Sequence, residues 1–80
     1  MSDDSFAWVR DQLTGILGLD AADITKDSRF ADDLDADSID LIEMVNAAEA
    51  TFGVTVEEDQ LYDIETVGDF VRLLDARRSA

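Results

Sequence analysis

The sequence predicts an all-α fold: a small four-helix bundle with three main helices, one short helix, and a long loop between the first and second main helices. Apolar side chains recur at helical spacing in three separate stretches of the 80 residues. The alternation of Val54 and Val56 with polar residues has no second strand to pair with. A chain of this length can form one small core, so we expect a single domain over residues 1–80.

Composition limits the classes of function. The 20 acidic and 6 basic side chains give a net charge of −14, which repels nucleic acid and anionic membranes and attracts basic protein partners. Cysteine and histidine are absent, which excludes disulfides, the usual zinc ligands and Ser-His or Cys-His catalytic pairs. No membrane span or signal sequence is evident. We expect a cytoplasmic monomer.

The first helix is predicted to begin between Asp3 and Ser5, residues that suit a helix N-terminus. Its apolar stripe consists of Phe6, Val9, Leu13, Ile16 and Leu17. Gly18 stands where a left-handed C-cap is expected. Trp8 lies off the stripe, and we expect it to be partly exposed and to pack on neighbouring side chains.

A long loop follows, from Leu19 to Asp37, and it is rich in turn-forming aspartates. Loops of this length are functional or flexible unless they pack side chains of their own. Ile24, Phe30 and Leu34 are the expected anchors of this loop to the core.

The second main helix runs from the Asp37–Ser38 junction to Phe52, and Gly53 ends it. At about 100° per residue, one arc faces the core. Its members are Leu41, Met44, Val45, Ala48 and Phe52. The opposite face carries Ile39, Ile42, Glu43, Asn46 and Ala50. Two isoleucines on a polar face indicate a small interaction patch.

The rest of the chain is predicted to return to the core and form the last helix. Residues 57–62 form one short helical turn, and Thr66 with Asp69 resembles a capping box. The apolar stripe of the last helix is Val67, Phe70, Val71 and Leu74.

Ser38 lies where the acidic loop meets the second main helix. If Asp37 is the N-cap and Asp40 its reciprocal partner, Ser38 is the first helical residue and its hydroxyl is free. If Ser38 is itself the cap, the hydroxyl is occupied. Asp37 is at least as good a cap, so we favour the first arrangement. A phosphate ester here would lie at the positive end of the helix, although Asp33 and Asp35 would repel it. Ser38 could equally be an ordinary serine at a helix start.

The segment Asp33–Asp40 resembles the phosphopantetheine attachment motif of acyl carrier proteins, the free-standing carriers of type II fatty-acid and polyketide systems. Leu41–Val45, Glu49–Val54 and Ile64–Phe70 continue the family pattern. The resemblance covers nearly the whole chain. The short Asp-Ser motif is weak by itself, but the flanking pattern makes the resemblance specific.

This resemblance implies that Ser38 receives 4′-phosphopantetheine covalently from coenzyme A, through a separate Mg²⁺-dependent phosphopantetheinyl transferase. The thiol of the arm would hold acyl intermediates as thioesters for a ketosynthase, an acyltransferase and other basic-surfaced enzymes. The carrier itself would have no catalytic residue and no metal site. The residues implied in partner binding are Asp37, Ile39, Asp40, Ile42, Glu43 and Asn46. An acyl chain would enter a space bordered by Met44, Phe52, Ile64 and Val67.

Three positions depart from the family pattern. Asp35 stands where glycine is frequent, Ile39 where leucine is frequent, and Leu41 where a polar residue is frequent. These departures favour a carrier of polyketide or other specialised biosynthesis over housekeeping fatty-acid synthesis. Two alternatives remain: a peptidyl or aminoacyl carrier with the same arm, and an acidic helical module that binds partners without covalent chemistry.

A calcium site is a further possibility, because Asp33, Asp35 and Asp37 alternate like the first ligands of an EF-hand loop. Ser38 replaces the glycine that such a loop requires, and Met44 stands where the bidentate glutamate belongs. We therefore expect a solvated acidic loop.

Overall fold

The computed structural model describes residues 3–78, and this part of the chain is helical with no strand longer than a single bridge. Its elements in order are α1 (Asp3–Leu17), η1 (Ala21–Asp23), α2 (Ser38–Phe52), η2 (Glu58–Asp63) and α3 (Val67–Arg78). The all-α prediction is confirmed, with η1 as an unpredicted turn of 3-10 helix inside the long loop. The predicted domain also included Met1, Ser2, Ser79 and Ala80, which lie outside the described residues.

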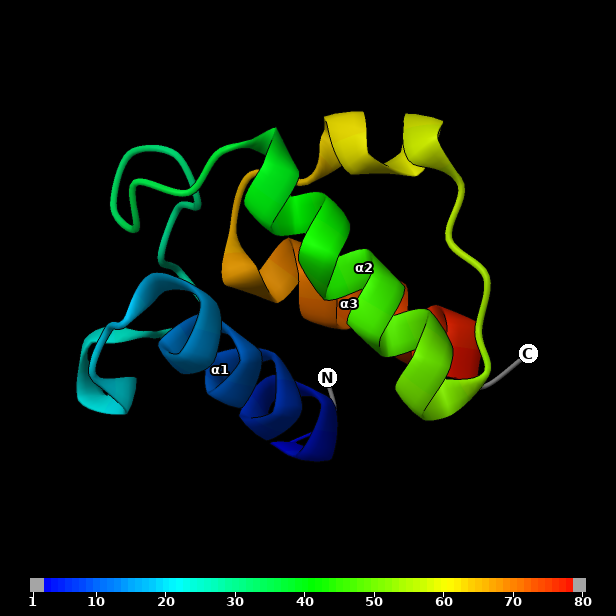
Figure 1. Ribbon diagram of the computed structural model, residues 1–80, viewed down its shortest axis with the longest axis horizontal. Helices are drawn as coiled ribbons and strands as arrows, with labels where there is room; N and C mark the ends of the chain where they lie inside the picture. Colours follow the sequence, from blue (N-terminus) through cyan, green and yellow to red (C-terminus); the bar gives the residue numbers. More distant parts are fainter. Residues whose placement is uncertain (1–2, 79–80) are drawn as a thin grey trace.

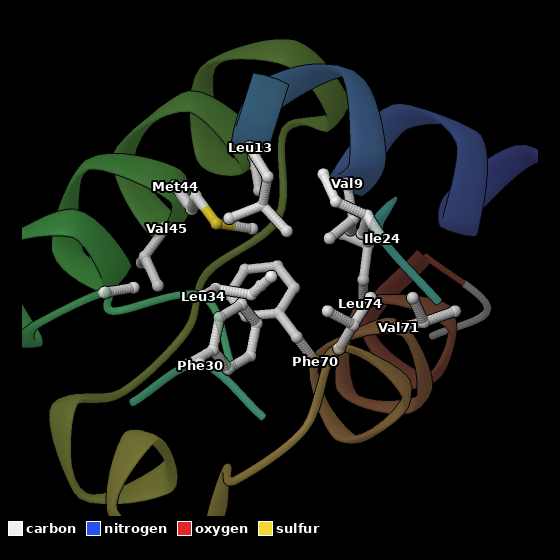
Figure 2. Close-up of a cluster of buried hydrophobic side chains, with 13 residues drawn as sticks. Val9, Leu13, Ile24, Phe30, Leu34, Met44, Val45, Phe70, Val71 and Leu74 are labelled. Carbon is white, nitrogen blue, oxygen red and sulfur yellow. The ribbon is translucent and has the colours of Figure 1, made fainter. Parts of the chain in front are cut away.

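The three long helices pack around one core. In Figure 1, α1 and α2 run in opposite directions and α3 lies behind α2. Side chains from every long helix and from the long loop meet in the centre, as Figure 2 shows. Within the described residues, no helix has the length and apolar character needed to cross a lipid bilayer.

The first helix places its predicted stripe in this core. Val9 and Leu13 are fully buried, whereas the other stripe residues are half-buried. Gly18 has a φ of 69°, and its N–H donates to the Thr14 carbonyl at 3.0 Å. The predicted left-handed helix end is therefore confirmed.

The long loop is anchored as predicted, because Ile24, Phe30 and Leu34 are all buried. The ring of Phe30 packs edge-on against Phe70 of α3, with centroids 6.3 Å apart. Figure 2 shows these rings beside Leu34 and Met44. The loop therefore supplies side chains to the core itself, which explains how so long a connection is ordered.

The same loop is joined to the start of α3 by an isolated antiparallel bridge between Arg29 and Thr66. On one side, the N–H of Val67 donates to the Ser28 carbonyl at 2.9 Å. On the other side, the N–H of Phe30 donates to the carbonyl of the residue before Thr66 at 3.0 Å. We call the paired segments 28–30 and 65–67 the loop–helix clasp. The sequence did not predict it.

The last helix begins with the predicted capping box. The N–H of Asp69 donates to Thr66 Oγ1, and the N–H of Thr66 donates to Asp69 Oδ2, both at 3.1 Å. The same carboxylate oxygen accepts the N–H of Glu65 at 3.1 Å. These contacts, led by the Glu65 N–H, hold the pKa of Asp69 below its usual range against the opposing effect of burial.

Aromatic side chains gather at the end of the bundle where α2 and α3 finish. The rings of Trp8 and Phe52 meet edge-on with centroids 5.1 Å apart, and the Arg78 guanidinium lies over the Phe52 ring. Phe52 was predicted to face the core, and it packs against the core while remaining half-buried. It stands in the last turn of α2, where Trp8 and Arg78 cover part of the ring.

Candidate functional site

The start of α2 is fixed by a reciprocal pair of aspartates. Asp37 is extended, with φ −105° and ψ −175°. Its Oδ1 accepts the N–H of Asp40 at 3.1 Å, while Asp40 Oδ2 accepts the N–H of Asp37 at 3.2 Å. This capping box is the arrangement predicted with Asp37 as N-cap. Ser38 is accordingly the first residue of α2.

Ser38 presents an alcohol to solvent. Within residues 3–78 its hydroxyl has no hydrogen-bond partner, since Asp37 and Asp40 satisfy the cap between them. The other serines of this range, Ser5 and Ser28, are 0% and 7% exposed. Ser38 is therefore the single serine hydroxyl of the described range that a second enzyme can reach.

Within the described residues, Ser38 is not paired with a side chain that could act as its base. The sequence contains no histidine, and the neighbouring carboxylates of Asp37 and Asp40 each accept a backbone N–H. An alcohol without a proton acceptor is a poor nucleophile. Among residues 3–78, no side chain is hydrogen-bonded to the Ser38 hydroxyl in a way that would activate it.

A depression of ≈ 450 Å³ opens beside Ser38, between the long loop, the first turn of α2 and the segment that follows η2. Its apolar lining comes from Phe30, Ala31, Ala36, Leu41 and Ile64. Leu41 had been predicted to face the core, and it is half-buried at this wall. Such a lining can accept an apolar or amphipathic group.

The family resemblance implies a space between the helices for an acyl chain. The residues predicted to border that space are mostly different from those that line this depression. Of the four residues predicted to border it, Ile64 alone lines the depression. Met44 and Val67 are fully buried in the core, and Phe52 lies at the other end of α2, about 21 Å from Ser38 at 1.5 Å per residue. The space between the helices that the family resemblance implies for an acyl chain therefore stays a prediction, separate from this depression.

The outward face of α2 is exposed as predicted. Ile39 and Ile42 are 64% and 44% exposed, and Glu43 and Asn46 are also exposed. Tyr62 on η2 is exposed as well. The two isoleucines therefore form an apolar strip among acidic side chains, directly after Ser38.

The acidic loop before α2 has its own internal order. The N–H of Arg29 donates to Asp33 Oδ2 at 2.8 Å, and the Arg29 guanidinium lies 3.5 Å from a carboxylate oxygen of Asp32. Asp35 adopts a φ of 56°, a left-handed conformation in which glycine is more stable. Within residues 3–78, no three acidic side chains form a group that could hold a metal ion.

Arg29 is the residue at this site that sequence reasoning missed. It lines the same depression as Ser38. A signal was available, because Arg29 is the one basic residue between positions 27 and 71. The bridge to Thr66, which fixes its backbone at this depression, could not be predicted from periodicity.

Residues 7–74 match the family described as "Phosphopantetheine attachment site". An acyl carrier protein from Petrotoga mobilis is 42% identical over 72 residues, which cover 90% of this chain and 85% of that protein. The chain belongs to the acyl carrier protein family. Members carry 4′-phosphopantetheine covalently, serve as carriers rather than catalysts, and work with a phosphopantetheinyl transferase and biosynthetic enzymes. The resemblance found in the sequence is confirmed.

Proposed function

We propose that this acyl carrier holds its 4′-phosphopantetheine arm on Ser38. The observation that carries the proposal is the capping box: Asp37 occupies the capping position, so the Ser38 hydroxyl is left free. Ser38 is also the single exposed serine of residues 3–78, and it lies within the stretch that matches the family. The arm supplies a thiol, which forms thioesters with acyl groups.

The site fits attachment by a separate enzyme. Ser38 Oγ attacks the phosphorus of the coenzyme A diphosphate that bears pantetheine. A new P–O bond forms to Oγ while the diphosphate bond breaks, and adenosine 3′,5′-bisphosphate leaves with the bonding electron pair. The hydroxyl proton passes to a base of the transferase, since within residues 3–78 no side chain is hydrogen-bonded to the Ser38 hydroxyl. Mg²⁺ bound by the transferase would neutralise charge on the diphosphate.

We further propose that the outward face of α2 binds the partner enzymes, which include the transferase, a ketosynthase and an acyltransferase. The residues of this face are Asp37, Ile39, Asp40, Ile42, Glu43 and Asn46. Its exposed isoleucines supply apolar contact area. The net charge of −14 steers basic partners toward the carrier.

The departures at Asp35, Ile39 and Leu41 favour a carrier of polyketide or other specialised biosynthesis. Ile39 is exposed on the proposed partner face, and Leu41 lines the depression beside Ser38. Ile39 would contact a partner enzyme and Leu41 would contact the arm. A different residue at either position would therefore affect which enzymes and acyl groups the carrier serves. Loading of the arm-bearing protein by polyketide, fatty-acid and amino-acid-adenylating enzymes separates these pathways.

Incubation with coenzyme A, Mg²⁺ and a broad-specificity phosphopantetheinyl transferase, followed by intact-mass analysis, tests the attachment residue. The natural chain is expected to gain one phosphopantetheine and Ser38→Ala none. Thr51→Ala is the matched control, because it removes an exposed hydroxyl from the opposite end of the same helix. A natural chain that gains no mass while a control carrier is modified contradicts the proposal, and so does a modified Ser38→Ala.

A further inference from the structure

Attachment of the arm creates an electrostatic problem at the start of α2. The phosphodiester adds a negative charge beside the acidic loop, in a chain whose net charge is already −14. The acidic residues nearest in sequence are Asp32, Asp33, Asp35, Asp37 and Asp40. A cation of the chain itself would offset this repulsion after the transferase has left. The inference below rests on the proposed attachment at Ser38.

Of the six basic side chains of the sequence, five lie away from the depression beside Ser38. Arg10 and Lys26 lie over the ring of Phe6 in α1, 5.3 and 5.6 Å from its centroid. Arg78 lies over Phe52 at the far end of the bundle. Arg72 pairs with Asp69 in α3, and Arg77 belongs to the last turn of that helix. Arg29 alone lines the depression that Ser38 also lines.

The backbone of Arg29 is held in place. Its N–H donates to Asp33 Oδ2 at 2.8 Å, and its carbonyl accepts the N–H groups of Asp33 and Leu34, both at 3.0 Å. Its bridge to Thr66 fixes it to the start of α3. The side chain therefore extends from a rigid base at the edge of the depression.

The guanidinium, by contrast, is weakly engaged. Its ion pair with Asp32 is 3.5 Å long, and the two side chains are 60% and 73% exposed. Exposed pairs of this kind contribute little to stability. A guanidinium binds a phosphate group through two parallel N–H donors, which is a stronger geometry than a single long contact to a carboxylate. The guanidinium can therefore leave Asp32 and pair with a phosphodiester with little loss of folding stability.

We infer that Arg29 is the phosphodiester-binding residue of the arm-bearing carrier. Its guanidinium leaves Asp32 and pairs with the non-bridging phosphate oxygens next to Ser38. This pairing brings the first part of the arm over the depression, whose apolar wall includes Phe30, Leu41 and Ile64. Arg29 is thus a positioning residue that orients the arm and takes no part in the chemistry of the thiol.

Phosphorus NMR of the arm-bearing protein tests this role. The variants are Arg29→Gln, which removes the charge, and Arg29→Lys, which keeps it. Arg72→Gln is the matched control, because Arg72 is 61% exposed and pairs with an aspartate at the same i,i+3 spacing. Intact mass first confirms that each protein carries one arm, and circular dichroism confirms that each is helical.

At low salt, Arg29→Gln is expected to displace the phosphorus resonance from its position in the natural chain. Arg29→Lys should restore most of the shift, and Arg72→Gln should leave the resonance unmoved. Added salt should move the resonance of the natural chain toward that of Arg29→Gln, because screening weakens the pair. The Nε–H resonance of Arg29 in the natural chain should shift when the arm is attached.

Coincident phosphorus resonances of the natural chain and Arg29→Gln at low salt would overturn the inference. If Arg29→Gln fails to fold, the Nε–H resonance of the natural chain decides: an identical position with and without the arm overturns the inference. Neither result contradicts the proposed attachment at Ser38, because intact mass will already have shown that the protein carries the arm. A natural chain that gains no arm overturns the proposed function and the inference together.

Discussion

The guanidinium carbon of Arg78 lies 4.3 Å from the centroid of the Phe52 ring, so the last turn of α3 covers the last turn of α2. The same guanidinium donates to the Ser5 hydroxyl at 2.8 Å. One side chain therefore connects all three long helices at the end of the bundle opposite Ser38. Figure 1 shows these three helix ends close together.

Phe52 should contribute less to stability than a ring in the core, because part of it remains exposed at this end of the bundle. Phe70 is 1% exposed, and we expect Phe70→Ala to lower the free energy of unfolding by about 3–5 kcal/mol. We expect Phe52→Ala to lower it by about 1–2 kcal/mol, because the ring is only half-buried. Urea unfolding of both variants measures the difference. An equal loss would contradict the packing described for Phe52.

The cap of α2 should tolerate loss of Ser38 but not of Asp37. We expect Asp37→Ala to lower the free energy of unfolding by about 1 kcal/mol, because the N–H of Asp40 loses its acceptor. Ser38→Ala should change it by less than about 0.5 kcal/mol, since Ser38 is exposed and its hydroxyl is free. Thermal unfolding of the two variants checks the order. A larger loss for Ser38→Ala would show that Ser38 is the cap.

Asp69 should make stability depend on pH. Its pKa is lowered in the folded chain, first by the N–H of Glu65. A carboxyl with a lowered folded pKa stabilises above its unfolded pKa, about 3.9, and that stabilisation is lost as the pH falls through the folded value. We expect Asp69→Asn to cost about 1 kcal/mol at pH 7 and progressively less below about pH 4.

Urea unfolding of the natural chain and Asp69→Asn over this pH range tests the expectation. Arg72→Gln is the control: it removes the ion pair but keeps the two backbone N–H donors to Asp69. It should therefore retain most of the pH-dependent stabilisation. A cost of Asp69→Asn that is the same at neutral and acid pH would show that ionised Asp69 contributes nothing specific.

Asp35 is expected to be a position where glycine stabilises the fold. Its φ of 56° is costly for a residue with a Cβ atom. We expect Asp35→Gly to raise the free energy of unfolding by about 0.5–1 kcal/mol, a net value because glycine also loses more backbone entropy on folding. Asp35→Asn is the control that removes the charge but keeps the Cβ atom. If both variants stabilise equally, charge repulsion is the cause instead.

Reversal of charge on the outward face of α2 should slow partner binding. Glu43 is exposed on that face, and Glu43→Lys should lower the association rate with a basic-surfaced transferase, more at low salt than at high salt. Asp11→Lys makes the same change of charge at an exposed position of α1. Stopped-flow binding compares the two. Equal rates for both variants would show that only net charge matters.

The sequence predicted those parts of the fold that depend on local spacing. The stripe of Val67, Phe70, Val71 and Leu74 is buried, and the caps at Asp37 and Thr66 form as expected. These features follow from helical periodicity and from side chains three residues apart, so neighbouring residues suffice to predict them.

The features that escaped prediction depend on residues far apart in the chain. The bridge between Arg29 and Thr66 joins positions 37 residues apart, and it brings Arg29 to the edge of the depression beside Ser38. The partial burial of Phe52 depends in the same way on Trp8 and Arg78. Short-range patterns contain no information on such encounters.

The loop–helix clasp has a further consequence for how the segment that contains Ser38 is attached to the bundle. It closes the chain into a ring between Arg29 and Thr66, and this ring contains Ser38, the whole of α2 and η2. Both ends of this ring are held by the same pair of neighbouring backbones, through the hydrogen bonds from Phe30 N–H to Glu65 and from Val67 N–H to Ser28. Segments on either side of α2 therefore cannot separate while these hydrogen bonds hold.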